Sequence, residues 1–277
     1  MNVGEIRIDS VLDGGARVPP TLAYGAPLGN LNGKGTDEAD WGPHRDLLDA
    51  DGMVELALGA FVLRGGPLGE RVVLVDAGCG PRGFAGFESG AMLGSLAAIG
   101  VATGDVTDVV FTHLHFDHVG WASRDGAAVF GNATYRCDEA DWAHFLGSPA
   151  TDRGHERSLR YIRPVADRFE MFSGTRPLFP GVNVQLAPGH TPGSTLVIVS
   201  DGDQRAILLG DVVHCPVELL DAEWGTIGDV DPDLAKRTRE ALARELEGTD
   251  VPIAAAHFPG LRFGRLLPGE GRRSWVV

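Results

Sequence analysis

The sequence predicts an α/β domain of the mixed (α+β) class. Short apolar runs, such as residues 106–111 and 205–209, indicate buried strands. Segments with apolar residues at helical spacing, of which residues 89–99 and 231–247 are examples, alternate with these runs. The chain has 277 residues, 43% of them hydrophobic, which is enough for one large core. We therefore expect one domain over residues 1–277.

The N-terminal part is expected to contain three strands and one long connection. Gly4–Leu12 alternates enough for an edge strand, and the turn signal Asp13-Gly14-Gly15 ends it. Residues 16–52 are polar and rich in Gly and Pro, and loops of this length usually have a function. Residues 54–63 and 71–75 then predict a hairpin.

The middle of the chain continues the alternation. The helix predicted over Ser89–Ile99 ends there because Gly100 is a stop signal. After the strand at 106–111, short strands are predicted at 128–130 and 133–136, and Asp138 is a candidate cap for a helix over 139–146. His144 and His155 are expected on the surface.

The C-terminal half predicts strands, one long helix and a last strand. Residues 182–186, 195–199 and 205–209 are the strands, and Asp201-Gly202 suits a hairpin turn. Asp231-Pro232 predicts a helix start, and that helix runs to about Glu247. The apolar run at 251–256 predicts the last strand.

The segment Thr112-His113-Leu114-His115-Phe116-Asp117-His118 is the strongest functional signal. Imidazole and carboxylate groups are ligands of zinc and also suit iron and manganese. In an extended segment, His113, His115 and Asp117 would share one face, and a turn at 116–117 would bring in His118. The alternative is a polar loop with histidines by chance, and four metal-capable residues within six positions weigh against it.

Three more metal-capable residues each follow an apolar run. They are His190, Asp211 and His257. Taken singly, each of these residues could be an ordinary turn residue. The repeated pattern predicts that they converge with the first segment.

The order His-x-His-x-Asp-His, Gly-His, Gly-Asp and a final His resembles the metallo-β-lactamase superfamily. The resemblance implies a four-layer αββα sandwich with two metal ions at one edge of its sheets. It implies that His113, His115 and His190 bind the first metal, that Asp117, His118 and His257 bind the second, and that Asp211 bridges the two. It further implies that Asp76 braces the ligand loop from behind.

The resemblance also implies a mechanism. A hydroxide shared by two divalent metal ions, with zinc favoured over iron or manganese, attacks a carbonyl or phosphorus centre. Asp211 and Asp117 are the expected catalytic residues, with Asp117 as a proton shuttle to the leaving group. Similar hydrolases cover the site with an N-terminal segment, so residues 16–52 are interpreted as either a lid or a surface wrap.

Three residues are candidate substrate contacts by chain distance. They are Trp121, His214 and Phe258. Trp121 and His214 have competing interpretations, as a core aromatic and as a loop cap.

Composition and charge restrict the partners, the disulfide content and the location that we expect for the protein. The net charge of −14 argues against nucleic acid and anionic membrane as partners, because both need basic surface. Three cysteines without a Cys-x-x-Cys predict no disulfide framework. The N-terminal residues do not form a signal peptide, and no apolar run reaches about 20 residues, so we expect a cytoplasmic location.

Among the branches of the superfamily, the sequence looks most like the lactonase and organophosphate-hydrolase branch. The leading hypothesis is hydrolysis of a small lactone or ester, such as an acyl-homoserine lactone. A phosphotriester, an aryl ester and a β-lactam are alternative substrates. A non-catalytic metal-binding interaction protein is the alternative from another class, and homo-oligomerisation stays open.

Overall fold

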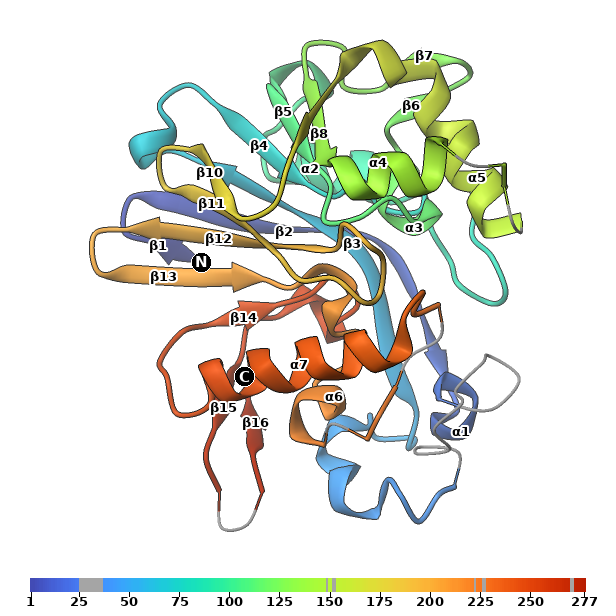
Figure 1. Ribbon diagram of the computed structural model, residues 1–277, viewed down its shortest axis with the longest axis vertical. Coiled ribbons are helices and arrows are strands. Elements are labelled where there is room, and N and C mark those ends of the chain that lie inside the picture. Colours follow the sequence, from blue (N-terminus) through green and yellow to red (C-terminus); the bar gives the residue numbers. More distant parts are fainter. Residues whose placement is uncertain (25–36, 148, 151–152, 222, 226–227, 270–271) are drawn as a thin grey trace.

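The computed structural model describes residues 1–24, 37–147, 149–150, 153–221, 223–225, 228–269 and 272–277. Its strands form two large sheets (Figure 1). In spatial order, the first sheet contains β1 (Asn2–Val3), β2 (Ile6–Val18), β3 (Val54–Arg64), β4 (Val72–Val75), β5 (Asp108–Val110), β8 (Thr134–Asp138) and β9 (Phe169–Phe172). The second sheet contains β10 (Arg176–Phe179), β11 (Val182–Leu186), β12 (Thr195–Asp201), β13 (Gln204–Leu208) and β14 (Ile253–Ala254). Two small ribbons pair β6 (Ser123–Arg124) with β7 (Ala127–Ala128), and β15 (Arg265–Leu267) with β16 (Ser274–Val276).

Helices cover the outer faces of both sheets (Figure 1). The described helices are α1 (Pro20–Ala23), α2 (Met92–Ala98), α3 (Phe116–Val119), α4 (Glu139–Leu146), α5 (Arg153–Ile162), α6 (Val217–Leu220) and α7 (Pro232–Leu246); α1 lies beyond the end of β2, away from the sheet faces. The predicted caps of α4 and α7 are confirmed: the Asp138 carboxylate accepts from the Ala140 N–H, and Asp231 accepts from the Leu234 N–H.

Alternation along the strands produces the four layers. In β4 and β5, Leu74 and Val109 point to the outer face, where they pack with residues of α2 and α4. Their neighbours Val73 and Val110 point inward and meet the second sheet. A third apolar cluster joins the second sheet to α7. The predicted αββα sandwich is confirmed.

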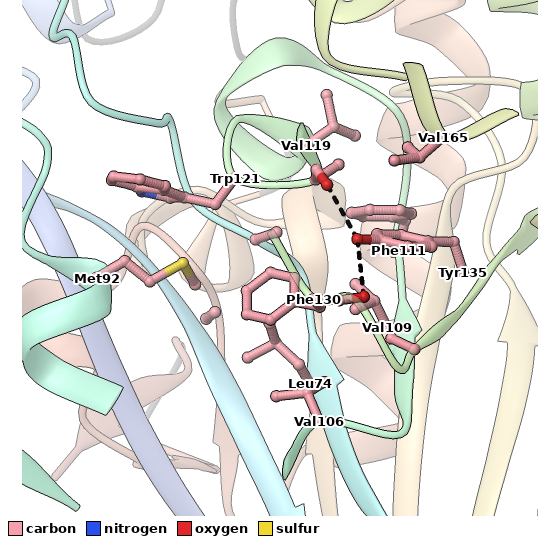
Figure 2. Packing of buried hydrophobic residues seen from close by; sticks show 14 of the residues in the cluster. Leu74, Met92, Val106, Val109, Phe111, Val119, Trp121, Phe130, Tyr135 and Val165 are labelled. Carbon is pink, nitrogen blue, oxygen red and sulfur yellow. Dashed lines mark hydrogen bonds between the residues drawn. The ribbon is translucent and has the colours of Figure 1, made fainter. Parts of the chain in front are cut away.

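The outer cluster of the first sheet also contains Trp121, which lies beside Met92 in Figure 2. Its indole Nε1 donates to Asp13 at 2.9 Å. In the same cluster, the Tyr135 hydroxyl donates to the carbonyl oxygen of Ala122 at 2.9 Å, so its buried polar end is satisfied.

The predicted turn at Asp13-Gly14-Gly15 is wrong. Strand β2 continues through it to Val18, with a bulge between Leu12 and Gly14, and the edge strand is β1. Gly14 is needed there because a Cβ atom would lie 2.0 Å from the carbonyl oxygen of Glu88. The bulge turns Asp13 inward, where its buried side chain accepts hydrogen bonds from loop 79–92.

Candidate metal centre and cavity

The first ligand loop follows β5 at the edge of the first sheet. Strand β5 ends at Val110, and Asp117 and His118 lie in the first turn of α3. The ligands therefore lie on a loop at the end of a buried strand, as expected, and a helical turn that starts at Phe116 directs Asp117 and His118. The loop is braced by Asp76, whose carboxylate accepts from the Thr112 N–H at 2.8 Å and lies 3.0 Å from Nδ1 of His118.

A second carboxylate links this loop to the one that carries His190. The buried Asp141 side chain of α4 accepts from the Leu114 N–H at 2.9 Å and from the Gly193 N–H at 2.7 Å. Burial raises the pKa of Asp141 to about 6, although these hydrogen bonds oppose the shift. The sequence marks Asp141 only as part of an Asp141-Trp142 pair that resembles the lactonase branch, with no role in bracing the loops.

The seven predicted ligands converge from both sheets. His190 lies between β11 and β12, Asp211 follows β13, and His257 follows β14. The donor atoms form one group with His113, His115, His190 and Asp211, and another with Asp117, His118 and His257. Within each group, the atoms lie within 4.8 Å of one another.

In the first group, Nδ1 of His115 lies 3.0 Å from Nε2 of His113 and 2.9 Å from Nε2 of His190. A neutral imidazole has one N–H and one lone pair, so three facing nitrogens cannot all be satisfied by hydrogen bonds to one another. A cation that accepts three lone pairs satisfies them at once. This donor set fits a metal ion.

Asp211 lies between the two groups. Its Oδ1 is 3.1 Å from Nε2 of His118, and its Oδ2 is 3.2 Å from Nε2 of His257. Oδ2 is also 3.6 Å from Nε2 of both His113 and His190. The carboxylate therefore faces ligands of both groups, and the donor set fits two divalent metal ions.

Outer partners orient most of the imidazoles from behind. Nδ1 of His190 lies 3.0 Å from Asp229, which in turn pairs with the buried Arg239 of α7 at 3.1 Å. Nδ1 of His257 donates to the carbonyl oxygen of Ala57 at 2.8 Å. Such partners fix the ring orientation of metal ligands. Sequence reasoning missed Asp229, because no motif marks it in the loop before α7.

Burial and charge shift the pKa values in the cluster in opposite directions. Burial and the neighbouring imidazoles lower the pKa of His113 and His115. Burial also acts to lower the pKa of His118, but the carboxylates of Asp211 and Asp76 outweigh it and raise the value. Burial acts to raise the pKa of Asp211, and the surrounding imidazoles lower it well below its usual range.

A cavity of about 780 Å³ opens onto both groups of donors. Six residues of the cluster line it, namely His115, Asp117, His190, Asp211, His214 and His257. The rest of its wall is mainly apolar, with Val18, Leu22, Ala23, Leu56, Phe84, Ala85, Phe87, Phe116, Phe145 and Val230. The site can therefore hold an apolar group beside the metal-binding atoms.

Two of the three candidate substrate contacts lie elsewhere. Trp121 is buried in the outer core of the first sheet (Figure 2), and Phe258 is buried against Trp275; neither lines the cavity. Both rings turn away because they pack into apolar clusters, Trp121 after the helical turn α3 and Phe258 after β14. His214 does line the cavity, with Nε2 3.0 Å from Oδ2 of Asp211. Burial acts to lower the pKa of His214, and the charge of Asp211 outweighs it and raises the value to about 10.

The expected surface position of His155 is wrong, whereas His144 is half-buried. Both line the cavity, and His155 is buried with Nε2 2.7 Å from the carbonyl oxygen of Phe145. Helices α4 and α5 pack together and direct both rings inward.

Some described residues of segment 16–52 line the cavity, and some pack against the surface of the domain. Leu22 and Tyr24 lie in the cavity wall. Tyr24 and Trp41 also pack edge-on against Trp224, with ring centroids 5.1 and 4.8 Å away. Residues 25–36, on which the lid interpretation also depends, lie outside the described residues.

Among the helices that the structure describes, none has the length and apolar character needed to cross a bilayer.

We compared the chain with known proteins. The chain is 25% identical over 154 residues to the N-acyl homoserine lactonase AiiA of Bacillus thuringiensis subsp. kurstaki, which is 54% of this chain and 56% of that protein. It is 30% identical over 132 residues to a probable metallo-hydrolase of Mycobacterium tuberculosis (strain ATCC 25618 / H37Rv), covering 42% of this chain and 40% of that protein. The chain thus spans about half the length of the curated relatives it matches.

Two solved structures share the fold over the whole chain. AidC, described as a dizinc quorum-quenching lactonase in complex with a product, has a TM-score of 0.85 at 23% identity, covering 100% of this chain and 95% of that one. The hydrolase AbOPH, of the beta lactamase superfamily, has a TM-score of 0.80 at 25% identity, with the same coverage. The sequence itself matches the metallo-beta-lactamase superfamily over residues 60–257. This chain therefore belongs to the metallo-β-lactamase superfamily.

Proposed function

We propose that this protein is a metal-dependent hydrolase that opens lactones, with N-acyl homoserine lactones as the favoured substrates. The observation that carries the proposal is the cavity, in which an apolar wall adjoins the donors of both metal groups. The partial similarity to an N-acyl homoserine lactonase supports the substrate class. We propose zinc as the metal because the donors are mainly imidazoles, and iron and manganese are the alternatives.

The chain's own residues have distinct roles in this proposal. The two cations, when bound, supply Lewis acidity and a water of lowered pKa. Asp211 holds the two metal groups together, and its position between them sets where the substrate carbonyl is presented. Asp117 lines the cavity and is placed to carry a proton to the alkoxide that leaves when the lactone ring opens.

The apolar wall binds and orients the acyl chain. Phe84 and Phe116 meet edge to face with ring centroids 4.7 Å apart, and both line the cavity. Their burial of an alkyl chain would add about 0.8 kcal/mol per methylene group, so longer acyl lactones should bind more tightly until the wall ends.

Proton release in a weakly buffered solution tests the proposal. Zinc-loaded protein is given acyl-homoserine lactones, an aryl ester, a phosphotriester and a β-lactam, with and without a chelator. Lactone opening that the chelator abolishes is the expected result. Turnover of only another member of this panel would move the substrate class. No turnover by a protein that holds two metals per chain would favour the non-catalytic binding role.

Location and assembly are also proposed. All three cysteines are buried thiols outside any disulfide, which supports a reducing compartment such as the cytoplasm. Homo-oligomerisation remains a prediction.

A further inference from the structure

His214 resembles the metal ligands in how it enters the site. Its Nε2 lies 3.0 Å from Oδ2 of Asp211, and its ring lies parallel to that of His257 with centroids 5.3 Å apart. The donor atoms of Asp211, His214 and His257 all lie within 4.8 Å of one another. His214 therefore offers an additional nitrogen beside the second group of ligands.

The surroundings of Asp211 Oδ2 favour coordination over a simple hydrogen bond. Four imidazole Nε2 atoms face this one oxygen at 3.0, 3.2, 3.6 and 3.6 Å, from His214, His257, His113 and His190. The two contacts at 3.6 Å are longer than hydrogen bonds, so direct hydrogen bonding does not explain why all four nitrogens face this oxygen. Cations between the oxygen and the nitrogens account for the crowding.

A buried carboxylate also lies behind His214, at a longer distance than behind the other ligands. His118 and His190 present Nε2 to the cluster and have a buried carboxylate behind Nδ1. Behind His214 lies Glu218 of α6, which is 1% exposed and has Oε2 3.9 Å from Nδ1. The buried Nδ1 has no hydrogen-bond partner among the described residues, so a small closing movement toward Glu218 would complete the arrangement.

Glu218 is held firmly enough to do this. Its carboxylate accepts from the backbone N–H groups of His214 at 3.1 Å and Cys215 at 3.2 Å, and from the Tyr24 hydroxyl at 2.5 Å. These contacts use local backbone and the N-terminal segment, and they leave the carboxylate facing the imidazole.

We propose that His214 is an eighth protein ligand, which binds the second metal ion together with Asp211 and His257, and that Glu218 is its positioning residue. The proposal rests on the dinuclear site of the proposed function, but it does not depend on the substrate.

Metal binding tests it without any substrate. Zn²⁺ and Co²⁺ are titrated into metal-free wild type, His214→Ala and Glu218→Gln in competition with a chromophoric chelator, and the visible absorption of the Co²⁺ forms is recorded. The wild type should bind two ions. His214→Ala should keep the tighter ion, weaken the other by about 100-fold or more, and change the Co²⁺ spectrum. Glu218→Gln should weaken the same ion by about 10–100-fold.

His144→Ala is the matched control, because His144 lines the same cavity outside the cluster and should bind both ions as the wild type does. If His214→Ala does not fold, His214→Asn provides the same comparison with a shorter polar side chain. Unchanged affinities and spectrum in the His214 variant would overturn the ligand role and leave the dinuclear site intact. A wild type that binds neither ion would overturn both the dinuclear site and this inference.

Discussion

Replacing Asp13 with Asn should destabilise the protein strongly. The buried carboxylate accepts five hydrogen bonds: Oδ2 accepts from the Cys79 and Gly80 N–H groups, and Oδ1 accepts from Gly90, Met92 and the Trp121 indole. An amide keeps only one of the two oxygens, so at least two of these bonds become contacts between donors. Hydrogen bonds to a charged group contribute about 1.5–3 kcal/mol each, so the expected loss is about 3–6 kcal/mol.

Urea unfolding of the zinc-loaded wild type and variant, followed by tryptophan fluorescence, measures this loss. A domain has about 5–15 kcal/mol of stability in total, so the unfolding midpoint should fall by a large fraction. Asp51→Asn is the control, because Asp51 is 74% exposed and pairs with Arg17 on the surface; its midpoint should not change. If Asp13→Asn unfolds within about 1 kcal/mol of the wild type, the five hydrogen bonds do not hold loop 79–92 as described.

Three further predictions concern the site. Asp211→Ala should lower lactone turnover by orders of magnitude and loosen the second metal, as seen by steady-state kinetics and metal analysis; full turnover would refute the dinuclear mechanism. Asp229→Asn should weaken the ion held by His190 by about 10–100-fold in chelator competition, because the amide is a poorer partner for the imidazole N–H, and equal affinity would show that Arg239 holds the loop alone. The raised pKa of Asp141, about 6, means that the folded protein binds this proton more tightly than the unfolded chain does. Its stabilising effect is therefore present at low pH and is lost as the pH rises from about 4 to about 6, by about 3 kcal/mol relative to Asp141→Asn in urea titrations.

The sequence was most informative where a signal is local. The caps at Asp138 and Asp231 and the hairpin around Asp201-Gly202 depend on neighbouring residues, and the structure confirms all three. The ligand set was recognisable because each of its members follows an apolar run, and the structure brings all seven together.

Sequence reasoning failed where a residue's role depends on distant partners. Asp13 looked like part of a turn, because its partners in loop 79–92 lie more than 60 positions away. Asp229 and Glu218 carry no motif, and only the packing of α6 and α7 puts them behind the imidazoles. His155 was expected on the surface, and it is buried because tertiary packing sets the face of α5. For Trp121, the core interpretation is the one that the structure confirms.

The ligands are spread over both sheets and over 145 positions, from His113 to His257. During synthesis, the segment from His113 to His118 leaves the ribosome long before β14 does, so the growing chain holds only an incomplete chelating set. The last ligand arrives when β14 adds parallel to β13, which is also the step that completes the second sheet. The second metal site is therefore completed only late, after the donors of the first group have been made. Free metal at about 1,000 times its dissociation constant would favour the finished chain by about 4 kcal/mol for each site, so the supply of metal in the cell would set the yield of folded protein.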